Sequence, residues 1–386
     1  MALVHAYIEV TVLPDGINFY CRGLGLTLKR RLSPTWVELA GANLPIYLLA
    51  NRPPLADLGS KQVARTYERH WTPVHLDFIV EDLDQMVAQL IALGASLDDR
   101  IKDMDVEGRD IDFLIPGTWA TAASGLPDVT LAEALYRSYH NYIAAYCQPY
   151  LSRLKSMILV PGGDVEWAVK EVNRLKNEPW VAAVWPLLPE GKPVDHPDLA
   201  PLCDVMNDAH LPILFHSFFY EPPYFPGYRD IWGNAVVART AAHPWGAARL
   251  LSYLIVGQIF DKYPNINAGV AEVGHGWLPH WVIRLGEMIR YVSGATPPLK
   301  YHPIEYVQMG RFRCGAEPFE GPAMTKAVID ILGPGALMHQ SDYPHGEAHF
   351  PDTAQMVLDW PIWKDLGGEV LRQHMSGNAE KFLRLN

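Results

Sequence analysis

Residues 336–351 read ALMHQSDYPHGEAHFP, an apolar run that ends in Ser341, Asp342, Tyr343 and Pro344. The proline predicts that a β-strand stops here, because its ring nitrogen cannot donate a hydrogen bond to a sheet. In a parallel β/α barrel, catalytic groups stand at the carboxyl ends of the strands. Asp342 is therefore a candidate catalytic residue. The alternative is that Asp342 and Tyr343 open a turn that His345 caps.

Six more apolar strands precede this one in the chain. With it, the expected strands span residues 111–117, 153–162, 181–189, 211–218, 266–274, 311–318 and 336–344. Amphipathic helices separate them: Thr130 and Glu133 form a capping-box pattern before one helix, and Asp164 precedes another. Near-continuous apolar strands that alternate with helices predict an α/β fold with a parallel sheet buried on both faces. Seven such units predict a (β/α)8-type barrel that lacks its own first strand.

The first hundred residues follow a different pattern. Strands are expected in residues 3–12, 35–41 and 42–50, with a helix in residues 14–26 that ends in glycines. A further strand in residues 72–83 leads into a helix in residues 83–93, which Asp82 caps and Gly94 stops. The charged segment DDRIKDMDVEGRD, residues 98–110, then breaks the apolar pattern. We therefore expect a small α+β module in residues 1–101 and the barrel in residues 102–386.

Composition narrows the class of protein. The formal net charge of -11, without a basic run, argues against binding to nucleic acid or to a cytoplasmic membrane surface. Cys21, Cys147, Cys203 and Cys314 are widely spaced and form no CxxC pair, which is typical of a reducing cytoplasm. The sequence contains no signal-peptide pattern and no apolar run long enough to span a bilayer. We expect a cytoplasmic protein that acts on a small molecule.

Titratable residues collect at three of the predicted strand ends. His216 closes one strand, Glu272 and His275 close the next, and Asp342 closes the last. Imidazole and carboxylate groups on one face of a barrel suit a divalent metal, or a general acid and base that exchange protons with a substrate. For each residue alone, the alternative is a simple hydrogen bond to its own loop. Three consecutive strand ends favour a functional site.

Further residues are expected to line a substrate pocket. The loop in residues 217–234 is rich in aromatic residues that would cover the pocket, namely Tyr220, Tyr224, Phe225, Tyr228 and Trp232. Aromatic and proline content alone can also order a long loop.

His345 is also expected to bind substrate, and weaker candidates are His243, and Glu317 together with Arg313. His243 precedes a proline, so the alternative is that it starts a helix.

The front module contains HAYIEV, FYCRGLGL and HLDFIVEDLD in order within residues 3–95. These motifs resemble the glyoxalase, or vicinal-oxygen-chelate, fold. The resemblance implies a βαβββ half and metal-ligand positions at His5 and His75. Tyr47 stands where that family has a glutamate, and the second half stops after its βα portion. In the alternative, His5 and His75 are ordinary strand residues of a degenerate module.

The rest of the chain contains MDVEGRDIDFLIPG, RLKSMILVP, PILFHSF, EVGHGWLPHWVIRLGEM, SDYPHGEAHFP and GNAEKFLRLN. Over residues 104–386 it resembles the branch of the amidohydrolase superfamily that includes aminocarboxymuconate-semialdehyde decarboxylase. The resemblance implies a metal-bearing (β/α)8 barrel that performs hydrolysis or non-oxidative decarboxylation. His216 and Asp342 match its metal-ligand positions, and Glu272 stands where that family often has a histidine, with His275 three residues further on. We expect metal ligands at His216, at Glu272 or His275, and at Asp342, with Glu272 as the first choice, and we assign catalytic roles to Asp342 and His275.

The chain departs from this pattern in one respect, because it contains no His-x-His pair for the first strand. A natural fusion, a replacement strand, or two broken reading frames joined in gene prediction would each give this sequence. Two hypotheses follow. The first is a metal-dependent hydrolase or decarboxylase of a small carboxylated aromatic or cyclic substrate, with zinc as the expected metal and iron or manganese as alternatives. The second is a non-catalytic binding protein or subunit, without metal, that pairs with an intact homologue. A homo-oligomer is compatible with the acidic composition.

Overall fold

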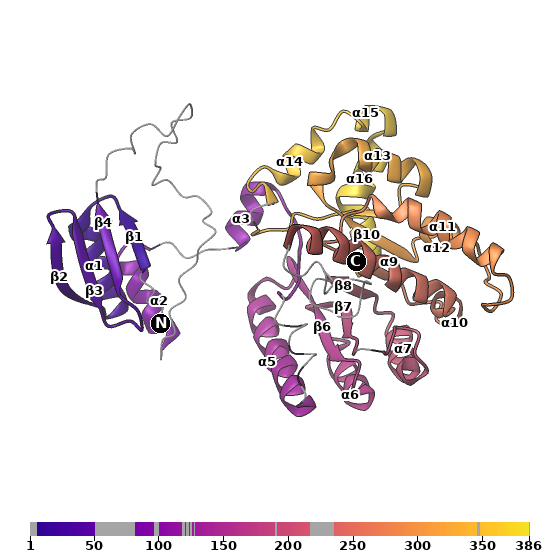
Figure 1. Ribbon diagram of the computed structural model, residues 1–386, viewed down its shortest axis with the longest axis horizontal. Helices are drawn as coiled ribbons and strands as arrows, with labels where there is room; N and C mark the ends of the chain where they lie inside the picture. The colour runs from indigo at the N-terminus through magenta and orange to yellow at the C-terminus, as the bar shows by residue number, and fades with distance from the viewer. Residues whose placement is uncertain are drawn as a thin grey trace. The chain divides into compact units, whose positions relative to one another are not determined.

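The computed structural model describes residues 6–50, 82–95, 100–117, 120, 123, 126, 128–189, 191–216, 235–345 and 348–385. Contacts divide the chain into two compact units, Met1–Arg100 and Ile101–Asn386, and each is described by itself (Figure 1). Among the described helices, none is long and apolar enough to cross a lipid bilayer.

The first unit contains one four-stranded mixed sheet. Its elements are β1 (Ala6–Val10), α1 (Leu13–Leu24), β2 (Thr27–Ser33), β3 (Trp36–Ala40), β4 (Ile46–Ala50) and α2 (Leu83–Ala92). The strand order is β1-β4-β3-β2, with β1 parallel to β4 and the other pairs antiparallel. This is the βαβββ half that the sequence implied. The strand β2 was not predicted, because its sequence TLKRRLS is charged and almost wholly exposed.

Two local sequence signals in this unit are confirmed, namely the N-cap of α2 and the glycine that ends α1. Asp82 caps α2 by accepting a hydrogen bond from the backbone N–H of Gln85 at 2.9 Å. α1 ends at Gly25, whose φ of 68° lies in the left-handed region that glycine adopts without cost. Most of the strand predicted in residues 72–83, including His75, lies outside the described residues, as does His5.

The second unit contains a curled sheet of seven parallel strands in the described residues. The strands are β5 (Asp112–Leu114), β6 (Leu154–Pro161), β7 (Val181–Leu187), β8 (Ile213–His216), β9 (Ala268–Ala271), β10 (Phe312–Ala316) and β11 (Leu337–His339). Their order follows the chain, β11-β10-β9-β8-β7-β6-β5, so β5 and β11 form the two edges. The prediction of an α/β barrel one strand short is confirmed, and each observed strand lies within its predicted range.

Helices pack outside this sheet. The main ones are α3 (Arg100–Glu107), α5 (Val129–Cys147), α6 (Val165–Leu175), α7 (Ala200–Asp208), α9 (Ala235–Val256), α11 (Trp277–Tyr291), α12 (Pro303–Gln308), α13 (Gly321–Leu332), α14 (Thr353–Leu358) and α17 (Asn378–Leu383). Figure 1 shows α5 and α6 beside β6, which both helices contact. Seven of the eight residues of β6 are buried, as expected for a strand covered on both faces.

Two predictions about helices need correction. Residues 98–110 were predicted to be a charged break, but Arg100–Glu107 forms α3, because charged residues are compatible with a helix that exposes one face. The start of α5 was predicted at Thr130, but Asp128 is the N-cap, and it accepts from the N–H of Leu131 at 3.1 Å. The N-cap predicted at Asp164 is confirmed, with a 2.9 Å bond from the N–H of Trp167.

Candidate functional site

Three acidic or imidazole side chains follow the carboxyl ends of barrel strands. His216 is the last residue of β8, Glu272 directly follows β9, and Asp342 lies three residues beyond β11. Because all seven described strands are parallel, their carboxyl ends lie at the same end of the curled sheet. The strand ends therefore place these residues on the face where barrel enzymes carry their active sites.

Glu272 forms the centre of this group. One of its carboxylate oxygens pairs with Nε2 of His216, and Nη2 of Arg239 in α9 lies 3.6 Å from the other. Burial alone would raise the pKa of Glu272. The bond from His216, with the charges of His216, His345 and His243, outweighs burial and leaves that pKa below its ordinary value. The group thus favours an ionised Glu272, which is the form that binds a cation.

Glu272, Asp342 and His345 together could hold a metal ion. Each offers one ligand atom, and these atoms all lie within 4.8 Å of one another. Nδ1 of His345 is 2.9 Å from Oδ1 of Asp342, and the side chain of His345 is 54% exposed. In the part of the chain that the structure describes, this is the group of three such ligands that fits an ion. It contains two of the three ligands proposed from the sequence, with His345 in place of His216.

The backbone is unusual at both acids of this group. Glu272 has a φ of 57° and Asp342 a φ of 56°, both in the left-handed region. The cost for a residue with a side chain is of order 1 kcal/mol or more, and such residues concentrate at functional sites. His349, a few residues after Asp342, has a φ of 54°. These conformations turn the chain sharply just beyond the strands, at the point where the carboxylates meet.

Glu317, a weaker candidate from the sequence, is a further acid of this site. It follows β10, is 5% exposed, and accepts from the N–H of Gly274 at 3.1 Å. Burial raises the pKa of Glu317 to about 7, and the charges of Asp342, Glu272 and Glu320 act in the same direction. The sequence signal for Glu317 was its position at the carboxyl end of β10, the strand between β9 and β11. It can carry a proton near neutral pH.

His275 is not part of the group of Glu272, Asp342 and His345. Its ring is fully buried, with Nε2 at 3.0 Å from Oγ1 of Thr325 in α13 and Nδ1 at 3.0 Å from Glu320. Burial lowers the pKa of His275, and the charge of Glu320 opposes that effect. The ring of His275 therefore contacts Thr325 of α13 and Glu320, the residue before that helix.

Arg313 and His243, two further candidates from the sequence, have different surroundings. Nη1 of Arg313 donates to the carbonyl oxygen of Gly310 at 2.7 Å, and Gly310 precedes β10, so Arg313 points toward the amino end of its strand. His243 lies inside α9, where burial lowers its pKa to about 4 while the charge of Glu272 raises it. His243 is thus within electrostatic reach of Glu272.

The five aromatic candidates from the loop, Tyr220, Tyr224, Phe225, Tyr228 and Trp232, lie outside the described residues.

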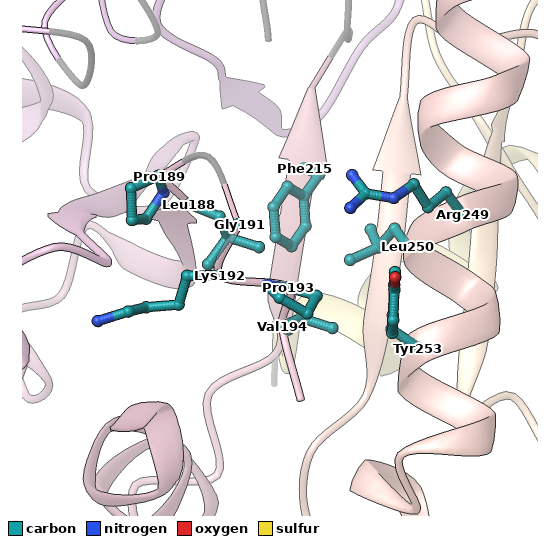
Figure 2. Close-up of a pocket in the computed structure, with 10 residues that line it drawn as sticks. All are labelled: Leu188, Pro189, Gly191, Lys192, Pro193, Val194, Phe215, Arg249, Leu250 and Tyr253. Carbon is teal, nitrogen blue, oxygen red and sulfur yellow. The ribbon is translucent and has the colours of Figure 1, made fainter. Parts of the chain in front are cut away.

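A separate pocket lies between the segment after β7 and helix α9. It measures about 400 Å³, part of it open to solvent, and is lined by Leu188, Pro189, Gly191, Lys192, Pro193, Val194, Phe215, Arg249, Leu250 and Tyr253. Figure 2 shows the guanidinium group of Arg249, a residue of α9, directed toward Phe215 of β8. Successive strand residues point to opposite faces, so Phe215 and its neighbour His216 point to opposite sides of β8. Neither His216 nor the group of Glu272, Asp342 and His345 lines this pocket.

Comparisons with known proteins match both units. Residues 116–385 match the family described as Amidohydrolase, and residues 5–112 match the family described as Glyoxalase-like domain. Both resemblances drawn from the sequence are thus confirmed. A search of curated proteins finds no match.

Several solved structures share the fold. The chain is similar to a 5-carboxyvanillate decarboxylase from Novosphingobium aromaticivorans DSM 12444, complexed with manganese and 4-hydroxy-3-methoxy-5-nitrobenzoic acid, at 21% identity and a TM-score of 0.62, covering 79% of this chain and 85% of that one. It is similar to a 2,6-dihydroxybenzoate decarboxylase from Rhizobium, at 18% identity and a TM-score of 0.61. The match covers 79% of this chain and 93% of that one. It is also similar to a dihydroxybenzoic acid decarboxylase from Polaromonas sp. JS666 with bound manganese, at 18% identity and a TM-score of 0.62, covering 79% and 91%.

Proposed function

Because the chain belongs to the amidohydrolase family, we propose that its barrel unit is a metal-dependent enzyme that removes carbon dioxide from a small aromatic carboxylic acid. The observation that carries the proposal is the group of Glu272, Asp342 and His345, whose ligand atoms lie within 4.8 Å of one another. The similar structures named above are decarboxylases of hydroxylated aromatic acids, which favours decarboxylation over hydrolysis.

The ligand set fits a divalent ion. Two carboxylates and one imidazole suit Mn²⁺ or Zn²⁺, and the manganese in two of the similar structures makes Mn²⁺ the first metal to test. When bound, such an ion supplies positive charge that polarises an oxygen of the substrate.

The residues of the chain then handle the proton and orient the substrate. Loss of carbon dioxide leaves an electron pair on a ring carbon, which must take a proton from an acid in the site. Asp342 is our candidate for that transfer, since it is bonded to His345, a group that can accept and return a proton. Arg239, which is 56% exposed beside Glu272, is a cation that fits the carboxylate of an incoming substrate.

The test combines metal binding with turnover. We expect the full chain to bind Mn²⁺ and to release carbon dioxide from 2,6-dihydroxybenzoate or 5-carboxyvanillate, and we expect a chelator to abolish the release. Glu272→Gln should remove both properties, because a neutral amide is a poor ligand for a hard cation. The exposed Asp365→Asn is a matched control that should retain both. A folded wild-type protein that binds neither Mn²⁺ nor Zn²⁺ would refute the proposal.

One observation favours the second hypothesis, a non-catalytic subunit. Among the described strands, β5 and β11 pair with one neighbour each, so the sheet has two edges where a complete barrel has none. A partner strand could fill that position. A protein that binds no metal yet forms a stable stoichiometric complex with an intact homologue would support this alternative.

A further inference from the structure

A glutamine side chain connects the two acids of the proposed metal site. The order of the strands is β9-β10-β11, so β10 separates Glu272, which follows β9, from Gln340, which follows β11. Oε1 of Gln340 nevertheless accepts a hydrogen bond from the backbone N–H of Glu272 at 3.2 Å. The side chain of Gln340 therefore passes over the end of β10 to reach the chain beyond β9.

Gly315 of β10 makes room for this crossing. A Cβ atom at Gly315 would lie 2.0 Å from Oε1 and 3.0 Å from Cδ of Gln340, distances at which something must move. The glycine sits in regular strand structure, where Gly315 pairs with Met338 of β11. Its role is therefore to leave space, because an ordinary strand conformation does not require glycine.

We propose that Gln340 is a positioning residue that sets Glu272 relative to Asp342, and that Gly315 is the residue that permits it. Asp342 lies two residues after Gln340, so one short segment carries both the metal ligand and the group that holds Glu272. The bond is made to the backbone N–H of Glu272, a residue whose φ of 57° needs support from its surroundings. This inference rests on the proposed metal site.

Titration of the full chain with Mn²⁺ tests the role of Gln340. Groups that orient metal ligands typically contribute 10-fold to 100-fold in affinity, so we expect Gln340→Ala to weaken Mn²⁺ binding by about tenfold. The thermal midpoint should stay close to that of the wild type, because Gln340 is partly exposed and its loss leaves no cavity in the core. Gln355→Ala, an exposed glutamine in α14, is the matched control and should leave the Mn²⁺ affinity unchanged.

A double-mutant cycle tests the role of Gly315. We expect Gly315→Ala to weaken Mn²⁺ binding, and to have no further effect once Gln340→Ala has removed the side chain that the new methyl group would displace. Gly368→Ala, where an added Cβ meets nothing within 4 Å, is the control. Additive effects of the two substitutions would overturn the assignment of Gly315.

The outcomes separate this inference from the proposed function. If the wild type binds Mn²⁺ and Gln340→Ala binds it equally well, the positioning role is wrong and the metal site stands. If the wild type binds no Mn²⁺, the metal site is wrong and the inference falls with it. If Gly315→Ala does not fold, the result for Gln340→Ala still decides the question.

Discussion

Tyr343 donates its phenolic hydrogen to Oδ2 of Asp103, although the two residues belong to opposite edges of the barrel sheet. Tyr343 follows β11, and Asp103 lies in α3, which leads into β5. The guanidinium carbon of Arg109 is 4.9 Å from the centre of the Tyr343 ring, and the N–H of Thr353 donates to Glu107 at 2.9 Å. Side-chain contacts thus join the segment before β5 to the segment after β11, which carries Asp342.

Removal of the Tyr343 hydroxyl should weaken this connection. Asp103 is 4% exposed, so Tyr343→Phe leaves a buried carboxylate with one bond fewer, and we expect stability to fall by about 2 kcal/mol. Urea denaturation measures this loss. Tyr291→Phe, at a side chain that is 81% exposed, should change stability by less than about 0.5 kcal/mol. Equal stability of the two variants would show that the contact contributes nothing.

Asp342→Asn should abolish turnover and leave the fold intact. The substitution keeps the shape of the side chain but removes its charge and its ability to take up a proton. Loss of a general acid or base lowers the rate by roughly 10²-fold to 10⁴-fold, and the activity assay with circular dichroism as a fold control measures this. By contrast, His75→Ala should leave turnover unchanged. Activity that survives Asp342→Asn and disappears in His75→Ala would place the active site in the first unit.

Acid should destabilise the barrel through His374 and its neighbour His339. His374 is 2% exposed, and burial first, then the charges of His339 and His275, lowers its pKa to about 3. Burial also lowers the pKa of His339 to about 4. The unfolded chain binds a proton at each residue below pH ~6.5, whereas the folded protein does not until the pH reaches these lower values. Stability should therefore fall as the pH drops from about 6.5 toward 4.

His374→Phe tests this dependence. The variant cannot be protonated at that position, so the slope of unfolding free energy against pH should decrease between pH 6 and 4, as measured by urea denaturation. The exposed His280→Gln is the control and should retain the wild-type slope. An unchanged slope in His374→Phe would mean that its imidazole does not resist protonation in the folded state.

Another buried histidine, His140, should stabilise the barrel. Nε2 of His140 accepts from the N–H of Leu159 at 3.0 Å, so Nδ1 carries the proton that it donates to Glu171 at 2.8 Å. Burial would raise the pKa of Glu171, but bonds from Arg174 and His140 outweigh it and lower that pKa to about 2. His140→Phe leaves a strand N–H and a buried carboxylate without this partner, so we expect a loss of about 3 kcal/mol in urea denaturation. A loss below 1 kcal/mol would contradict this account.

Much of the fold could be predicted from the sequence, because the signals that define it are local. Each barrel strand lies within its predicted range, since a strand buried on both faces must be apolar along its length. The caps at Asp82 and Asp164 were predicted for the same reason, because each side chain bonds an N–H only three residues further on. The carboxylates Glu272 and Asp342 were found by a similar rule, which places chemistry at the carboxyl ends of parallel strands.

The partners of these residues depend on the way distant segments meet. His345 lies 2.9 Å from Asp342 and within reach of Glu272 only because β9 and β11 end on the same side of the curled sheet. His275 follows Glu272 by three residues, yet it contacts Thr325, because a chain beyond a strand end keeps no regular direction. Gln340 reaches Glu272 only because a glycine lies between them in space. Residue types and strand ends can be predicted from the local sequence. Contacts between side chains far apart in the chain depend on the packing of the whole barrel.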